Sequence, residues 1–314
     1  MRRMRGVALI IALVVVALAT IMAARIGAQA ALDQRRSTAL LAQQQAFEVA
    51  LGAEAWAIEV LRDDAEHSTR DSLDEAWATP LPPLPIDGGT LQGQLEDMQG
   101  RFNLNNLVKP DGTRNDVAFA HFQRLLARLE LEPKWASLML DWIDADSIAD
   151  GVDGAEDGFY MGQSPPYRTA NRPVTSTSEL LALPGFGTER FRRLQPFVAA
   201  LPPGSQLNVC TAPGIVLDAL VPGLDRFGQD AKQLATNREK GCFPLKADVE
   251  SALQSLLSKP EERNQVLAGL SESSKWFRTT TVVSLGTTEL TLYSLIERNP
   301  GGYARVVLRT LGTE

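Results

Sequence analysis

The chain opens with an apolar run that limits what the rest of it can become. Residues 7–24 read VALIIALVVVALATIMAA, with Thr20 as the single polar side chain and no charge. A helix rises about 1.5 Å per residue, so this run crosses most of a hydrocarbon core about 30 Å thick. Arg2, Arg3 and Arg5 precede it, and the positive-inside rule therefore predicts a cytoplasmic N-terminus, with everything downstream delivered across the membrane.

Three interpretations of the run are open. A cleaved secretory signal would end near Ala28–Ala30, but the run exceeds the roughly 7–15 residues of such a signal and Arg25 interrupts it. A plain single-pass anchor is the second. We favour the third, a prepilin-like leader, in which MRRMRG ends at Gly6, Val7 opens the helix, and cleavage falls before the apolar run.

The helical pattern continues beyond the membrane. Residues 32–61 contain no proline, and Gly52 is the only residue that interrupts a helix-forming composition. Apolar side chains recur there at helical spacing, which predicts a helix of about 55 residues and about 80 Å. A removed signal does not need such an extension, whereas the spine of a pilin does.

Downstream segments predict an α+β fold. Residues 90–98 read as a strand after a proline-rich connector, and residues 277–285, 290–297 and 303–311 read as an antiparallel meander. Two helices are predicted over 117–131 and 134–143. We expect the long N-terminal helix to pack on the sheet, with a large all-α domain inserted. The predicted units are a leader (1–6), a transmembrane and spine helix (7–65), a linker and first strand (66–102), an inserted α-helical domain (103–205), and a second helical hairpin followed by the C-terminal sheet (206–314).

Residues 141–160 are densely acidic. Glycines interleave with the carboxylates in DWIDADSIADGVDGAEDGFY, and without a cation these charges would repel. Ca²⁺ accepts six to eight oxygen ligands in irregular geometry, so we predict calcium here, although the EF-hand spacing is not met. The alternative is a solvated acidic loop. The candidate ligands are chiefly Asp146, Asp153, Glu156 and Asp157, with Asp144 as a further candidate.

Residues 175–198 predict a helical hairpin around the turn Pro184–Gly187, and a weaker echo follows at 216–234. The pattern resembles the helix-hairpin-helix module, which holds a DNA phosphate with backbone amides. A membrane-anchored DNA-binding receptor is therefore an alternative function. The net charge of −7 and the pI near 5.1 argue against it, and we favour hairpins that serve only as packing units.

Two cysteines are present, Cys210 and Cys242. On the oxidising side of a membrane they are expected to form a disulfide, worth about 3–4 kcal/mol by the chain-entropy relation. The alternative is two unpaired buried thiols. No enzyme is predicted, because the sequence holds no nucleophile–base pair, GxSxG, P-loop or zinc spacing.

Several motifs, in a characteristic order, resemble one family. RGVALIIALVVVALAT, GRFNLNNL, DWIDAD with DGAED, PPYRTANRP and SELLALPGF are similar to the K-type minor pseudopilins of the type II (general) secretion pathway. The resemblance implies a pseudopilin fold with a large α-domain and bound Ca²⁺. It also implies I-type and J-type minor pseudopilins and the major pseudopilin as partners. A prepilin peptidase would cleave between Gly6 and Val7 and methylate Val7. The protein would then span the bacterial inner membrane once, with most of the chain in the periplasm.

Ile11 is the fifth residue after the implied cleavage site. The resemblance implies glutamate there in most pseudopilins, paired with the N-terminal amine of a neighbouring subunit. An unpaired carboxylate in hydrocarbon costs several kcal/mol, roughly, so an apolar residue suits a subunit with no neighbour above it. We therefore expect this chain at the tip of the pseudopilus, where it primes assembly and limits length. The alternative is tolerance of isoleucine at an internal position.

Overall fold

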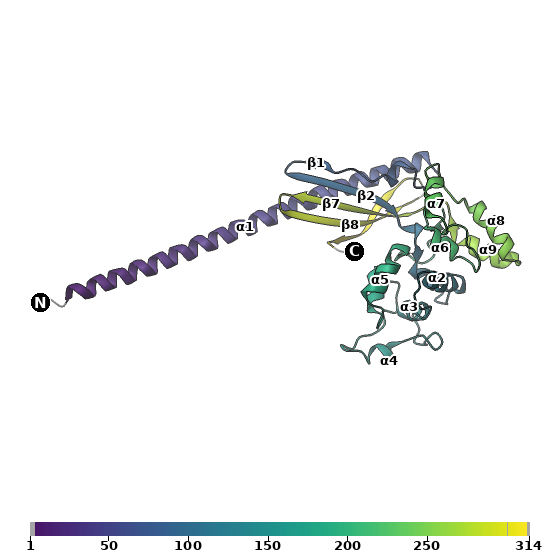
Figure 1. Cartoon of the computed structure of the whole chain (residues 1–314), viewed down its shortest axis with the longest axis horizontal. Helices are drawn as coiled ribbons and strands as arrows, with labels where there is room; N and C mark the ends of the chain where they lie inside the picture. The colour runs from purple at the N-terminus through teal and green to yellow at the C-terminus, as the bar shows by residue number, and fades with distance from the viewer. Residues whose placement is uncertain (1–3, 300, 313–314) are drawn as a thin grey trace.

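The computed structural model describes residues 4–299 and 301–312. One continuous helix, α1 (Met4–His67), forms the spine, and its N-terminal part extends alone away from the rest of the molecule (Figure 1). Arg2 and Arg3 of the predicted leader lie outside the described residues. The predicted end of the helix at residue 65 lies two residues from the observed end. By length and composition, α1 can cross a membrane, and its most apolar window is fully exposed.

A five-stranded antiparallel sheet lies against the second half of α1. Its order is β1-β2-β7-β8-β9, so the chain leaves the sheet after β2 and returns to pair β7 directly with it. The strands predicted from alternation are confirmed to within two residues at each end. Their bounds are β2 (Gly89–Asp97), β7 (Trp276–Leu285), β8 (Thr288–Arg298) and β9 (Ala304–Leu311). The short strand β1 (Leu84–Ile86) lies in the segment predicted as a proline-rich connector and is not among the predicted strands.

Small residues let α1 approach the sheet closely. Ala46 and Ala50 are fully buried against Val283 and Leu292. Both strand residues face the helix, because side chains alternate between the two faces of each strand. Glu54 adds a polar anchor in the middle of this interface, where both of its carboxylate oxygens accept hydrogen bonds at 2.8 Å from the guanidinium of Arg309. The predicted packing of a long helix on an antiparallel sheet is thus confirmed.

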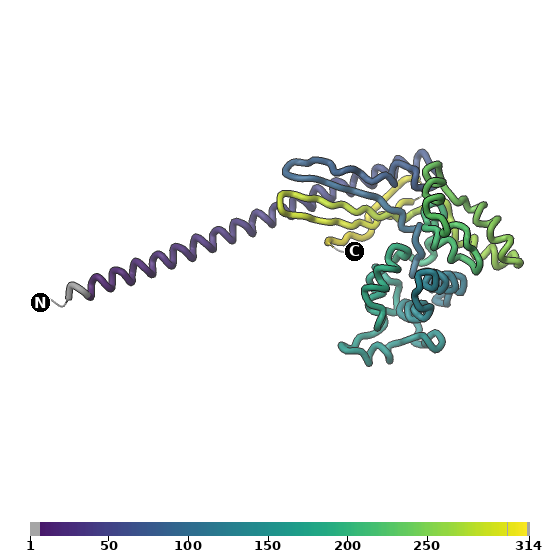
Figure 2. The backbone as a smooth tube through the Cα atoms, in the orientation of Figure 1, coloured from purple at the N-terminus to yellow at the C-terminus, as the bar shows by residue number. Residues whose placement is uncertain are grey.

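Residues 98–275 form the insertion, which is mainly helical. Figure 2 shows its two ends leaving the sheet next to each other and its helices gathered at the end of the molecule opposite the N-terminus. Its helices and short strands, with one 3₁₀ helix that precedes it, are η1 (Ala76–Ala78), η2 (Met98–Gly100), β3 (Phe102–Asn103), η3 (Leu104–Leu107), α2 (Asp116–Arg128), α3 (Trp135–Ile143), α4 (Asp157–Tyr160), η4 (Thr177–Ala182), α5 (Gly187–Leu194), η5 (Gln195–Phe197), β4 (Val198–Ala199), β5 (Leu207–Asn208), α6 (Gly214–Asp218), α7 (Ala231–Arg238), α8 (Lys246–Leu256), α9 (Pro260–Ala268) and β6 (Leu270–Ser271).

A single hydrophobic core runs through the insertion from Phe102 to Leu270. The boundary predicted between residues 205 and 206 falls inside this core, because β5 pairs in parallel with β6 and Val209 is fully buried among the helices. Cys210 and Cys242 are joined here, with their sulfur atoms 1.93 Å apart. The second helical hairpin therefore belongs to the inserted domain rather than to the sheet.

The first hairpin serves packing. Its turn uses Gly185 and Gly187, both at positive φ, and Phe186 between them is fully buried edge-on against Trp135. Arg190 donates to Glu132 and to the carbonyl of Gly185, while Arg193 donates to Glu130 and to a carbonyl at the end of α2. Arg190 and Arg193, two of the three arginines that follow the turn, thus already contact acceptors of the protein itself.

Candidate metal centre

The acidic loop begins where α3 ends. Asp141, in the last turn of this fully buried helix, accepts hydrogen bonds from the backbone N–H of Asp150 at 3.0 Å and of Ala155 at 2.6 Å. The loop is thereby folded back onto the helix. Gly154 is needed for this closure, since a Cβ there would lie 2.3 Å from the Asp141 Oδ2 atom. Asp141 therefore shapes the loop.

Three carboxylates converge inside the closed loop. One oxygen from each of Asp144, Asp146 and Glu156 lies within 4.8 Å of the others. Asp144 caps the C-terminus of α3 and Glu156 precedes α4, so two elements bring them together. Asp144 is buried, Glu156 is half-buried, and Asp146 faces solvent.

Three of the six carboxylate oxygens of this group are buried without a hydrogen-bond partner. Asp144 Oδ1 and both carboxylate oxygens of Glu156 are buried and unpaired in the described structure. Buried polar atoms are normally hydrogen-bonded, and leaving one unpaired costs about 1–3 kcal/mol. Such a cluster of unpaired acceptors is the arrangement expected where a cation binds.

A buried amide close to the end of α3 also has an unpaired oxygen. Asn171 donates its backbone N–H to the carbonyl of Trp142 at 3.0 Å, two residues before Asp144, and its Oδ1 atom is buried and unpaired. Its backbone lies at φ 47°, which is uncommon outside glycine. Sequence reasoning missed this residue, although it lies in the PPYRTANRP motif used above to recognise the family.

The electrostatics agree with this geometry. Burial, and secondarily the neighbouring carboxylates, raises the pKa of Asp144 to about 7 and that of Glu156 to about 7. Burial likewise raises the pKa of Asp141 to about 6, against the two backbone N–H groups that lower it. Without a cation, the surroundings of Asp144 and Glu156 therefore disfavour the charged forms of both carboxyl groups.

The remaining acidic residues lie outside the group of three. Asp157 accepts hydrogen bonds from the backbone N–H and the hydroxyl of Thr169, at 3.1 and 3.0 Å. Asp150 is paired with Arg114 at 2.6 Å, and Asp153 is exposed on a turn. The structure therefore brings together three of the five predicted ligands, Asp144, Asp146 and Glu156, and separates Asp153 and Asp157 from them.

The donor set fits a hard divalent cation. The three carboxylates offer only oxygen atoms, and Asp146 faces solvent, so water could complete a coordination shell. Ca²⁺ accepts such sets, whereas Mg²⁺ demands near-octahedral geometry and Zn²⁺ favours nitrogen and sulfur. A bound cation would supply the charge that the unpaired oxygens lack.

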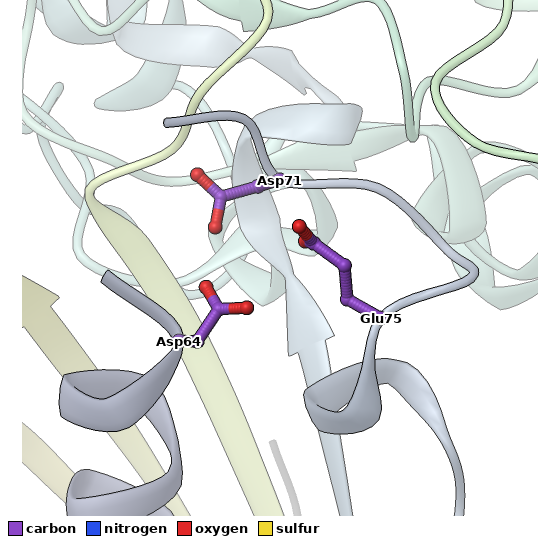
Figure 3. Close-up of side chains that lie close together, drawn as sticks. All are labelled: Asp64, Asp71 and Glu75. Carbon is purple, nitrogen blue, oxygen red and sulfur yellow. The ribbon is translucent and has the colours of Figure 1, made fainter. Parts of the chain in front are cut away.

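A second group of three carboxylates lies at the end of α1. Asp64 projects from the last turns of the helix, and Asp71 and Glu75 project towards it from the segment that follows (Figure 3). Here a cation is built in, since the Arg298 guanidinium pairs with Asp64 at 2.7 Å and with Asp71 at 2.5 Å. Glu75 accepts from the backbone of Ser72 and from the Trp77 indole. We call this group the junction cluster.

The predicted processing and assembly residues lie on the free part of α1. Gly6 is inside the helix, and the side chains of Val7 and Ile11 are 57 % and 58 % exposed. An apolar side chain that faces outward here suits hydrocarbon rather than water. The structure places these residues far from the metal centre (Figure 1).

Comparisons with known proteins agree with this architecture. Residues 100–203 match the family model "Type II secretion system (T2SS), protein K". The chain is 38 % identical to Type II secretion system protein K of Pseudomonas aeruginosa over 99 % of its own length and 94 % of the relative. It is 34 % identical to the protein of that name from Aeromonas hydrophila, over 95 % and 94 %.

A solved structure shows the same fold. The crystal structure of the GspK-GspI-GspJ complex from the enterotoxigenic Escherichia coli type 2 secretion system contains a chain that is 27 % identical, with a TM-score of 0.74. The match covers 89 % of this chain and 100 % of that one. With its spine helix, its sheet and its inserted helical domain, this chain belongs to the type II secretion system protein K family, the minor pseudopilins that the sequence motifs indicated.

Proposed function

We propose that this chain is the tip subunit of the type II secretion pseudopilus, where it primes assembly and limits fibre length during export of folded proteins. The observation that carries the proposal is Ile11, an outward-facing apolar side chain in the membrane-spanning part of α1. A carboxylate at this depth needs a partner charge. A subunit with no neighbour above it has none, so isoleucine is stable there and glutamate is not.

The inserted domain supports the same position. Figure 1 shows its helices beyond and beside the sheet, at the end of the molecule opposite the N-terminus of α1. A subunit inside a helical fibre must contact neighbours both above and below. A bulky domain at the distal end is compatible with a contact below and obstructs one above.

We assign the partners and the location by the same reasoning. The related E. coli protein is crystallised with GspI and GspJ, and we propose I-type and J-type minor pseudopilins as partners here, with the major pseudopilin below them. Prepilin peptidase would cleave between Gly6 and Val7 and methylate Val7. The protein would span the inner membrane once, with its head in the periplasm, where the Cys210–Cys242 disulfide persists.

The test combines dosage with Ile11→Glu. Excess wild-type protein is expected to shorten or abolish pseudopili, because each additional tip subunit starts a new fibre. Ile11→Glu is expected to weaken this effect, since it introduces an unpaired carboxylate into the membrane. Ile10→Val, a neutral change on the same exposed helix, is the control. Long fibres that carry this subunit along their length contradict the proposal.

We propose Ca²⁺ as the ligand of the metal centre, held by Asp144, Asp146, Glu156 and Asn171. The unpaired buried oxygens support this assignment. Extracellular calcium modules bind at about 10⁻⁴–10⁻³ M, and a ligand that binds only the folded state stabilises it. Calcium would therefore hold the distal loop of the inserted domain in one conformation.

A further inference from the structure

An apolar pocket opens between α1 and the segment that connects α1 to the sheet. Its volume is about 190 Å³, and its walls include Ala53, Trp56 and Trp77 together with Leu81, Leu84 and Leu95. An engineered apolar cavity of about 150 Å³ binds benzene, so this pocket has room for one large apolar side chain. We call it the Trp56 pocket.

The indole of Trp56 marks this pocket as an unfilled surface. Trp56 is 46 % exposed, whereas Trp77 on the opposite wall is 2 % exposed and packs edge-on against Phe277. Tryptophan is enriched at the energetically important centres of protein interfaces, because it combines a large apolar area with little side-chain entropy. A half-exposed tryptophan at the mouth of an apolar hole is thus a ready contact for another chain.

An acidic hollow adjoins the pocket and defines the charge of its occupant. Trp56, Val60 and Trp77 line both spaces, so the two are continuous. The hollow is lined by four carboxylates and one imidazole, namely Glu59, Asp63, Asp64, Glu75 and His67. Within the described part of the chain, no lysine or arginine lines it.

Internal cations neutralise only part of this charge. Arg62 pairs with Glu59, and Arg298 pairs with Asp64. Asp63 lies 3.8 Å from the Nδ1 atom of His67, and Glu75 accepts hydrogen bonds from Ser72 and Trp77. Neither carboxylate has a lysine or arginine partner among the described residues. The hollow therefore keeps a negative potential, which attracts a basic group on an approaching partner.

We infer that this composite site receives one large apolar side chain with a neighbouring lysine or arginine from an adjacent pseudopilin subunit. The inference rests on the proposed function for the identity of the partner. The apolar side chain fills the space beside Trp56, and the basic side chain lies over Asp63 and Glu75. The site is on the periplasmic half of α1, beyond the membrane-spanning run, where a neighbouring head can reach it (Figure 1).

The test fills the pocket without disturbing the core. Ala53 lies on the pocket wall, half-buried, so Ala53→Phe occupies the space from the rim. Ala55→Phe adds the same ring two residues away at an exposed position that does not line the pocket. Full-length variants in detergent are titrated separately with the soluble heads of the I-type and J-type pseudopilins of the same bacterium, after equal melting temperatures are verified.

We expect Ala53→Phe to weaken binding of one head at least tenfold and Ala55→Phe to leave it unchanged. Asp63→Asn should weaken the same binding about threefold and reduce its salt dependence, whereas Glu48→Gln, an exposed carboxylate elsewhere on α1, should do neither. Wild-type affinity in Ala53→Phe for both heads overturns the inference and leaves the proposed function standing. Failure of wild-type protein to bind either head overturns both.

Discussion

Two regions of the molecule each bring oxygens of three carboxylates within 4.8 Å of one another. They differ in whether a cationic side chain pairs with those carboxylates. In the junction cluster, Arg298 pairs with Asp64 and Asp71, and Glu75 accepts a hydrogen bond from the backbone of Ser72. In the metal centre, no cationic side chain pairs with Asp144 or Glu156 among the described residues, and their oxygens are left unpaired. Proximity of acidic groups therefore does not define a metal site; an uncompensated and buried set of oxygens does.

The comparison also separates two structural tasks. The junction cluster ties three parts of the chain together, because Asp71 accepts a hydrogen bond from the backbone of Ser274 while Arg298 binds both Asp71 and the spine helix. Its cation is the side chain of Arg298, which is part of the chain and cannot dissociate. At the metal centre, a bound cation would play the corresponding part for a loop within the inserted domain, and it could dissociate.

The largest expected effect removes the built-in cation. Arg298→Met should lower the free energy of unfolding by about 3–5 kcal/mol, because it leaves two buried carboxylates unpaired. Arg305→Met, which breaks an exposed pair with Glu297, should cost less than about 1 kcal/mol. Chemical denaturation of both variants measures the difference. A loss below about 1 kcal/mol for Arg298→Met would show that the junction cluster does not need its arginine.

The second-largest expected effect comes from adding Ca²⁺ to the proposed metal centre. At 1 mM Ca²⁺ and a dissociation constant near 10⁻⁴ M, the folded state gains about 1.4 kcal/mol relative to EDTA. Thermal melts of the wild type should show this gain. Glu156→Gln should lose it, and Asp153→Asn, a change outside the group of three, should retain it. An equal melting temperature in EDTA and in millimolar Ca²⁺ would contradict the proposal that this site binds calcium.

A smaller effect tests the fourth ligand. Asn171→Gly keeps the positive φ of the backbone but removes the amide oxygen, so it should weaken Ca²⁺ binding about tenfold and reduce the gain at 1 mM by about 1 kcal/mol. Gln163→Gly, elsewhere in the same loop, is the control. Calorimetric titration reports the affinity directly. Unchanged affinity in Asn171→Gly would place the amide outside the coordination sphere.

The last prediction is a pH dependence of stability in EDTA. The folded-state pKa values of Asp144 and Glu156 are raised to about 7, so the folded protein binds their protons more tightly than the unfolded chain. Their stabilising contribution is complete below the unfolded pKa values near 4 and is lost as the pH rises through about 7. The metal-free wild type should thus gain stability as the pH falls from 8 to 6.

A double variant isolates that dependence from other groups. Burial also raises the pKa of Asp71 to about 7, so the junction cluster titrates in the same direction. The difference between the wild type and Asp144→Asn/Glu156→Gln removes this shared part. Parallel stability–pH curves for the two proteins would contradict raised pKa values at the metal centre.

Most of the fold could be predicted from sequence, because periodicity reports it directly. Strands β2, β7, β8 and β9 and helices α2 and α3 lie close to the predicted ranges, since each has one apolar face. The extent of the inserted domain could not be predicted. Its core depends on contacts between β5 and β6, which are short and far apart in sequence, so no local pattern reveals them.

The candidate site was predictable as a segment and not as a ligand set. Carboxylate density located the loop, but the direction of each side chain depends on turns fixed by Asp141 and Gly154. Asp157, a predicted ligand, is held instead by Thr169 from a distant segment. Asn171, which we propose as a further ligand, lies in the same later segment, and a neutral amide gives no signal of charge clustering.

The direct pairing of β2 with β7 determines when the head can fold. The partner of β2 is synthesised only after the whole of residues 98–275. The inserted domain already contains its own core, so it can close first and bring its two ends together. That closure removes the loop entropy that would otherwise oppose β2–β7 pairing, a cost that grows as about (3/2)RT ln n with loop length. Closure of the inserted domain would therefore favour the later formation of the sheet that carries it.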